Sequence, residues 1–232
     1  MNDLYQAQRA MRALRTTAIQ RGVIAVMDVG SSKVACLILR FDGPSEISSG
    51  EVIGSMAGQS SFRVIGAATT KSRGMRFGEI ESMAETERAI RTALQAAQKM
   101  ALVRVDHVIG CFSGGAPRSY GVFGQVPIED DAVQSQDIGR VLAACDLPDF
   151  GEHRAVMHAQ PINFTLDDRA WMADPRGHVG QNLSADLHIL TVEERAIQNL
   201  SHCVKRCDVE LAGVASSAYV SAHAALVEDE QE

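Results

Sequence analysis

The amino-acid sequence predicts an α/β fold that is interrupted by a small α+β insert. Three strand patterns and one long helix pattern open the chain, and an alternation of strand, helix, strand and helix closes it. Short strand patterns dominate the stretch between them, where only one short helix is indicated. Because alternating strands and helices favour a layered α/β architecture, we expect the two outer segments to form one unit that the middle segment interrupts.

The composition is that of an ordinary globular protein, with 46% hydrophobic and 22% charged residues among 232. The net charge of −7 argues against nucleic acid as a partner, since such proteins carry a broad basic surface. No run approaches the roughly 20 apolar residues of a membrane span. The cysteines are odd in number and widely spaced, so we expect free thiols in a reducing cytoplasm. They are Cys36, Cys111, Cys145, Cys203 and Cys207.

Residues 1–21 stand apart as a basic, amphipathic segment. The arginines there outnumber the single acid, Asp3, and apolar residues recur at spacings of three and four, at Leu4, Ala7, Met11, Leu14 and Ala18. Three interpretations stay open. The segment is a helix that binds a membrane surface or a partner, a frayed extension, or an organelle transit peptide, which is also rich in arginine and poor in acids.

The first part of the expected α/β unit is residues 22–100. Strand patterns occupy Val23–Met27, Val34–Phe41 and Arg63–Thr70, with a loop rich in Gly, Pro and Ser between the last two. From Glu79 to Ala101 the apolar period changes to that of a helix. Its expected buried face consists of Met83, Ile90, Leu94, Ala97 and Ala101.

The expected insert is residues 101–180. A strand pattern at Val103–Phe112 ends in Ser113-Gly114-Gly115, and a second follows at Tyr120–Ile128. A short helix is expected over Asp137–Cys145, before Pro148. Two further strand pieces, Ala155–His158 and Ile162–Leu166, complete the insert, which we expect to make protein–protein contacts.

The unit resumes over residues 181–232. A strand at Leu183–Val192 is followed by a helix, a strand at Val209–Val214, and a helix that Ser216 or Ser217 would cap. The first helix shares one face among Ile197, Leu200, Cys203, Val204 and Cys207. His202 and the two cysteines have a spacing that a metal site would allow, but their apolar neighbours favour buried thiols, so we expect no metal.

The sequence D-x-G-S-S-K, from Asp28 to Lys33, separates the first two strands. A glycine permits a sharp bend with close approach of the backbone, and consecutive amides with two hydroxyls can form an anion-binding nest. Lys33 would add a positive charge, and Asp28 would hold Mg²⁺ through water. The motif therefore predicts a phosphate site made of Asp28, Gly30, Ser31, Ser32 and Lys33. A plain polar hairpin turn requires the same residue types, so that alternative stays open.

Several segments, in one order from about Gly22 to Glu232, resemble FtsA, the actin-like bacterial cell-division family. The first phosphate loop of that family is similar to VIAVMDVGSSKVACLILR, and the segment before its long helix is similar to SRGMRFGEIES. The core of its inserted subdomain is similar to FSGGAPRSYGVFGQVPIED, and the stretches that follow it are similar to EHRAVMHAQPINFTLDD and to the segment that begins LHILTVEERAIQ. Ordered segments of this kind are more specific than any single motif.

The resemblance implies an actin-like, ribonuclease H-like subdomain interrupted by the FtsA-type subdomain. It also implies a cell-division scaffold rather than an enzyme: a peripheral protein on the cytoplasmic side of the inner membrane that binds ATP with Mg²⁺, associates with itself, links the FtsZ ring to the membrane and recruits later division proteins. The inserted subdomain serves such contacts in the family. Our candidate contact residues are Ser113, Gly114, Gly115, Arg118, Tyr120 and Phe123.

The sequence departs from the family pattern after its acidic end. The family continues with a second phosphate loop, a second actin-like half, to which FtsZ binding is attributed, and a terminal amphipathic membrane helix. None of these occurs in the sequence, so we expect a truncated chain with weak or absent ATP affinity, cytoplasmic if it stands alone. Other actin-like proteins, of the pilus-assembly or rod-shape type, are the alternative family. A sugar or acetate kinase is disfavoured, because no general base with supporting context is found.

Overall fold

The computed structural model describes residues 22–41, 62–167 and 169–226. These residues form two compact units. The first comprises 22–41, 62–117 and 192–226, and the second comprises 118–167 and 169–191. The amphipathic segment expected at 1–21 and the loop expected at 42–61 lie outside the described residues.

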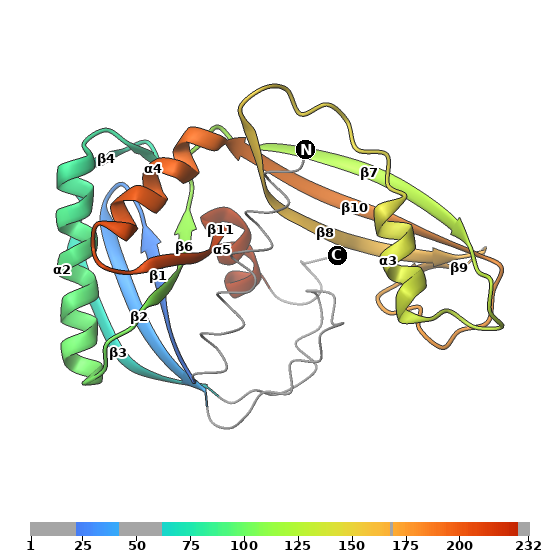
Figure 1. Ribbon diagram of the computed structural model, residues 1–232, viewed down its shortest axis with the longest axis horizontal. Coiled ribbons are helices and arrows are strands. Elements are labelled where there is room, and N and C mark those ends of the chain that lie inside the picture. Colours follow the sequence, from blue (N-terminus) through green and yellow to red (C-terminus); the bar gives the residue numbers. More distant parts are fainter. Residues whose placement is uncertain (1–21, 42–61, 168, 227–232) are drawn as a thin grey trace. The chain divides into compact units, whose positions relative to one another are not determined.

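The first unit contains a five-stranded sheet with the order β11-β6-β1-β2-β3 (Figure 1). The strands β1 (Val23–Val29), β2 (Lys33–Phe41) and β3 (Phe62–Lys71) form the antiparallel part, as their alternating apolar residues predict. The strands β6 (His107–Phe112) and β11 (Glu210–Ser216) continue the sheet parallel to β1. Three strands of the sheet thus end at the same edge.

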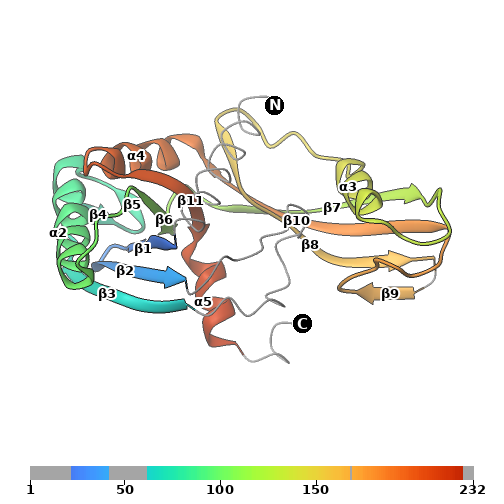
Figure 2. The same ribbon diagram turned by 60° about the horizontal axis from the view of Figure 1, so that its bottom comes forward.

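Two helices pack against this sheet and against each other (Figures 1 and 2). The helix α2 (Met83–Ala101) contacts β2 and β3, and α4 (Glu194–Lys205) contacts β11. The buried side of α2 includes Ile90, Leu94 and Ala97, as its period predicts. A Cβ added at Gly66 of β3 would lie 2.4 Å from the carbonyl oxygen of Ala97, so a glycine is required for this close approach.

The helix predicted from Glu79 begins four residues later in the structure. The strands β4 (Met75–Arg76) and β5 (Glu79–Ile80) pair as a short antiparallel hairpin before it. Ser82 then caps α2, its hydroxyl accepting a hydrogen bond from the amide of Glu85 at 3.4 Å. Glu79 and Ile80 therefore pair with β4 instead of forming the first turn of the helix.

The second unit is a four-stranded sheet with one helix packed on it. The order is β7-β10-β8-β9, and the helix is α3 (Ser135–Ala143). The strands are β7 (Arg118–Pro127), β8 (Arg154–Leu166), β9 (Arg169–Met172) and β10 (Asn182–Glu193). A core of buried residues lies between sheet and helix; it includes Val126, Ile138, Val141, Phe164, Leu166 and Leu183. Alternation along β10 sends Leu183, Ala185, Leu187 and Ile189 into the two apolar clusters of this unit.

The second unit differs in extent from the expected insert of residues 101–180. The strand β6, which local periodicity placed in the insert, pairs in parallel with β1 and belongs to the first unit. Residues 182–191, expected in the outer unit, pair instead with β7. The two strand pieces expected at 155–158 and 162–166 are one continuous strand, β8, which runs through Pro161.

The last helix, α5 (Ser217–Ala225), follows β11 directly and contacts β11 and β6. Ser216 occupies its N-cap position, although the side chain makes no capping hydrogen bond. The first residue of α5 is thereby placed at the sheet edge where β1, β6 and β11 end.

Candidate phosphate-binding site

The predicted phosphate loop is a tight hairpin between β1 and β2. Gly30 donates its amide to the carbonyl oxygen of Lys33 at 3.1 Å, which closes the turn. That amide is therefore used internally and is not part of an anion nest. Ser31, Ser32 and Lys33 are exposed at the turn.

Asp28 lies beside this turn at the end of β1. Its register partner in β6 is Cys111, whose own partner in β11 is Ala215, so the carboxyl ends of three parallel strands lie side by side. The hydroxyl of Ser217 donates to Oδ1 of Asp28 at 3.3 Å. Burial raises the pKa of the Cys111 thiol, and the negative charge of Asp28 raises it further. The thiol at this edge is thus kept protonated next to the carboxylate.

One further turn, from a distant part of the first unit, reaches the hairpin, and the turn after β6 contacts that turn. The amide of Gly78 donates to Oγ of Ser31 at 2.8 Å, and the amide of Gly115 donates to Oε1 of Glu79 at 2.5 Å. Gly78 has a φ of +82°, which favours glycine. Because Ser31 accepts this bond, its hydroxyl hydrogen remains available to an anion.

The predicted loop residues are brought together, whereas the six contact candidates are divided. Ser113, Gly114 and Gly115 belong to the first unit, in the turn after β6. Arg118, Tyr120 and Phe123 lie on β7 of the second unit. Phe123 is 54% exposed, while the Tyr120 ring packs against Phe150 with the centroids 5.1 Å apart. Of the β7 candidates, Arg118 and Phe123 therefore face solvent.

Sequence reasoning did not find that Gly78 contacts Ser31, that Ser217 contacts Asp28, or that Glu79 contacts Gly115. The partners in each pair are far apart along the chain, and only the fold of the first unit brings them together. The one sequence signal is the density of glycines in the two turns, at Gly74, Gly78, Gly114 and Gly115. Glycines in a turn indicate that another backbone segment approaches closely, but they do not indicate which segment it is.

This donor set suits a phosphate group. Exposed hydroxyls and a lysine provide hydrogen bonds and countercharge, and a glycine lets the chain turn tightly beneath them. The half-buried carboxylate of Asp28 is held in place by Ser217, in a position where water-mediated contact with Mg²⁺ is chemically reasonable. The residues present therefore fit the phosphates of a magnesium-bound nucleotide.

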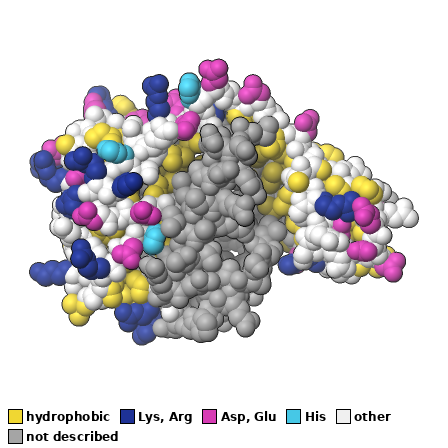
Figure 3. All heavy atoms as spheres, in the orientation of Figure 1, with side chains coloured by type: hydrophobic (Ala, Val, Ile, Leu, Met, Phe, Trp, Pro, Cys, Tyr) yellow, Lys and Arg dark blue, Asp and Glu magenta, His cyan; other side chains and the backbone are white. Residues whose placement is uncertain are grey.

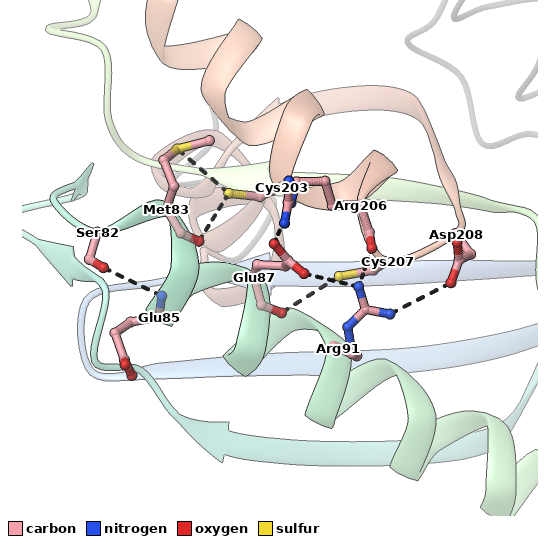
Figure 4. Close-up of polar contacts among 9 residues, drawn as sticks. All are labelled: Ser82, Met83, Glu85, Glu87, Arg91, Cys203, Arg206, Cys207 and Asp208. Atoms are coloured by element: carbon pink, nitrogen blue, oxygen red, sulfur yellow. Dashed lines mark hydrogen bonds and ion pairs between the residues drawn. The ribbon is translucent and has the colours of Figure 1, made fainter.

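Two cysteines of the helix face predicted from the sequence contact α2 (Figure 4): Cys203 lies in α4, and Cys207 follows the end of α4 at Lys205. Sγ of Cys203 donates to the carbonyl oxygen of Met83 at 3.8 Å, and Sγ of Cys207 donates to that of Glu87 at 3.6 Å. Burial raises the pKa of both thiols to about 11. Across the described residues, no three His, Cys, Asp or Glu side chains gather as a metal site. The cysteines thus act as buried helix-packing residues.

The charged side chains of the first unit alternate in sign over its helices. Figure 3 shows acidic and basic side chains interspersed in the region of α2 and α4. Neighbouring pairs include Arg88 with Glu85 at 2.8 Å and Arg91 with Glu87 at 3.0 Å. Mixed signs of this kind do not create the single-sign field that a polyanion requires.

Comparison with known proteins places these features in a family. The family model described as "SHS2 domain inserted in FTSA" matches residues 114–191. The cell division protein FtsA of Rhizobium meliloti is 34% identical over 212 residues, which are 90% of this chain and 46% of the relative. FtsA of Pseudomonas aeruginosa is 30% identical over 216 residues, covering 93% of this chain and 48% of the relative. The chain spans about half the length of the curated relatives it matches.

A solved structure shows the same fold. The PilM–PilN type IV pilus biogenesis complex matches with a TM-score of 0.51 at 10% identity, over 86% of this chain and 49% of the matched chain. With the matched insert, this confirms an actin-like α/β fold carrying an SHS2 subdomain. None of the described helices has the length and hydropathy of a membrane span.

Proposed function

This chain is an FtsA-family cell division protein, and we propose that it serves as a non-enzymatic scaffold that carries a phosphate site for ATP with Mg²⁺. One observation carries the proposal. The exposed residues Ser31, Ser32 and Lys33 lie at the edge where Asp28 ends its strand, and three parallel strands end together there. In open α/β sheets, ligands bind beyond the carboxyl ends of the strands.

Each residue has a distinct role in this proposal. The amides and hydroxyls of Ser31 and Ser32 would contact phosphate oxygens, and Lys33 would supply the countercharge. Asp28, oriented by the 3.3 Å bond from Ser217, would approach Mg²⁺ through water. The magnesium ion would offset the negative charge of the phosphates. These roles hold ATP without activating a nucleophile, so we propose a scaffold rather than an enzyme.

The partners follow from the family rather than from the site. We propose that the chain acts in division together with FtsZ and later division proteins, that it associates with itself, and that it works on the cytoplasmic side of the inner membrane. The match of the inserted domain over residues 114–191 supports the contact role of the second unit.

The test is direct binding of ATP, with and without Mg²⁺, to the full chain and to Lys33→Ala. The charge-assisted contact predicts a loss of about tenfold in affinity for Lys33→Ala. Asp28→Ala should instead remove the dependence on Mg²⁺. Lys99→Ala is the matched control, because it removes an equal charge from the last turn of α2. Equal affinities for wild type, Lys33→Ala and Lys99→Ala, or no binding to any of them, would show that the site is not a nucleotide site.

A further inference from the structure

We propose that Glu79 is a positioning residue that joins the phosphate hairpin to both segments through which the chain enters and leaves the second unit. We call these segments the connectors; they are residues 113–117 and 192–193, which directly precede and follow the second unit. Only the link to a bound nucleotide rests on the proposed function. The link between the hairpin and the connectors rests on the contacts of the first unit.

A sequence of hydrogen bonds runs from the hairpin to the connectors. The amide of Gly78 donates to Ser31 of the hairpin at 2.8 Å. The next residue, Glu79, accepts the amide of Gly115 at 2.5 Å, a charge-assisted bond from the first connector. The carbonyl oxygen of Gly115 in turn accepts the amide of Glu193, in the second connector, at 2.7 Å. Glu79 is the only side chain between the turn and the connectors in this path.

The packing around this path leaves little room for an alternative arrangement. A Cβ added at Gly114 would lie 2.3 Å from the carbonyl oxygen of Gly78. One added at Gly115 would lie 3.0 Å from the Cβ atoms of Val192 and Ala196. A side chain would not fit at either position, so the backbone of the first connector lies directly against the 77–79 turn and the start of α4. The carboxylate of Glu79 then sets the register of the connector.

A ligand at the hairpin would act on the same bonds. It would strengthen the contact between Ser31 and Gly78, because a phosphate accepts the hydroxyl hydrogen of Ser31 while the amide of Gly78 donates to the oxygen of the same hydroxyl. Through Glu79, ligand binding would change the local stability of the two connectors without moving them far. Because such coupling is reciprocal, a partner that binds the second unit and changes the stability of the connectors would also change the stability of the hairpin.

The experiment measures hydrogen–deuterium exchange of single amides in the full chain without ligand. Glu79→Ala is compared with Glu81→Ala, which removes an exposed carboxylate from the same turn, and with Glu79→Gln, which keeps an acceptor oxygen. The diagnostic amides are those of Gly78 and Glu193, whose own acceptors are untouched by any of the substitutions. We expect Glu79→Ala to speed both by about tenfold, and Glu79→Gln by less.

Equal exchange of these two amides in Glu79→Ala and Glu81→Ala would overturn the proposal. A second arm adds ATP and Mg²⁺. If ATP protects the Glu193 amide in the wild type, and this protection is lost in Glu79→Ala although the variant still binds ATP, then the nucleotide is coupled to the connectors through Glu79. If wild type binds no ATP while Glu79→Ala still loosens both amides, the proposed function fails and the positioning role of Glu79 stands. If ATP binds to the wild type without protecting the Glu193 amide from exchange, the proposed coupling between the nucleotide and the connectors is wrong.

Discussion

Nε of Arg206 lies 2.5 Å from Oε2 of Glu87, and this ion pair joins the end of α4 to the first half of α2. Arg91 donates to the other carboxylate oxygen of Glu87 at 3.0 Å and also to the carbonyl oxygen of Arg206. Glu87 is therefore held by one arginine from each side of the helix pair (Figure 4). The Glu87 side chain is 18% exposed, whereas that of Arg206 is 60% exposed, so the carboxylate is the better shielded partner of the ion pair.

Glu87→Gln should destabilise the protein in a pH-dependent manner. The hydrogen bond from Arg206, then that from Arg91, lowers the pKa of Glu87 below its ordinary value of 4.5. A lowered folded-state pKa contributes stability that is complete above about pH 4.5 and is lost as the pH falls through the folded value. Urea unfolding, measured from neutral pH down through pH 4.5, should therefore show the free energies of unfolding of the wild type and Glu87→Gln approaching each other as the pH falls. Glu85→Gln, whose partner Arg88 is on the same helix, is the control and should change little.

Gly114→Ala should destabilise the first unit by about 1–3 kcal/mol, the usual effect of forcing an extra methyl group into a packed site. The added Cβ would lie 2.3 Å from the carbonyl oxygen of Gly78 and 2.5 Å from the Phe112 ring. Gly213→Ala is the matched control in the same unit, because its nearest neighbour would be 3.9 Å away. Thermal or urea unfolding measures both. Equal losses in the two variants would show that the contact at Gly114 relaxes easily.

The five thiols should resist modification in the folded protein. All are buried, and burial raises the pKa of Cys36 to about 12 and that of Cys203 to about 11. At pH 8 only about one in a thousand Cys203 side chains is a thiolate, which is the reactive form. A disulfide reagent should therefore titrate all five only after denaturant is added. Any thiol that reacts within seconds in native buffer would contradict this expectation.

Phe123→Ser should weaken self-association while leaving stability nearly unchanged. Phe123 projects from β7, an edge strand of the second unit, and is 54% exposed, so its replacement removes apolar contact area without opening the core. Gln125→Ser, two residues along and on the same face of β7, is the matched control. Sedimentation velocity over a concentration series measures the effect. Identical association by the two variants would exclude Phe123 from the interface.

Local patterns in the sequence were sufficient for most of the elements. The two apolar runs around Asp28 became β1 and β2, and the helical face through Ile90 and Leu94 is buried as predicted. The recognition of the actin-like family and of its insert was confirmed by the matched relatives and by the fold. These features are encoded by periodicity and by short motifs, which neighbouring residues determine.

Pairings between distant segments could not be predicted in this way. His107–Phe112 reads as any short buried strand, and only its parallel pairing with β1 assigns it to the first unit. The two strand pieces expected at 155–158 and 162–166 are one strand, β8, and Pro161 lies outside the stretch of β8 that pairs with β9, so its missing amide hydrogen leaves that ladder intact. The contact of Glu79 with Gly115 joins two turns that are 36 residues apart, which no local pattern reveals. The ligand roles of Asp28 and Lys33 stay predictions.

The bond between Glu193 and Gly115 also bears on how such a protein is assembled from parts. The chain leaves the actin-like unit after residue 117 and returns at residue 192. Close to these two points, the amide nitrogen of Glu193 lies 2.7 Å from the carbonyl oxygen of Gly115. An inserted domain whose ends meet in this way requires its host only to open one short loop, because the entropy of closing a loop rises slowly with its length. This point of the fold is therefore a natural graft junction, at which a whole module can be exchanged while each strand of the host sheet keeps its neighbours.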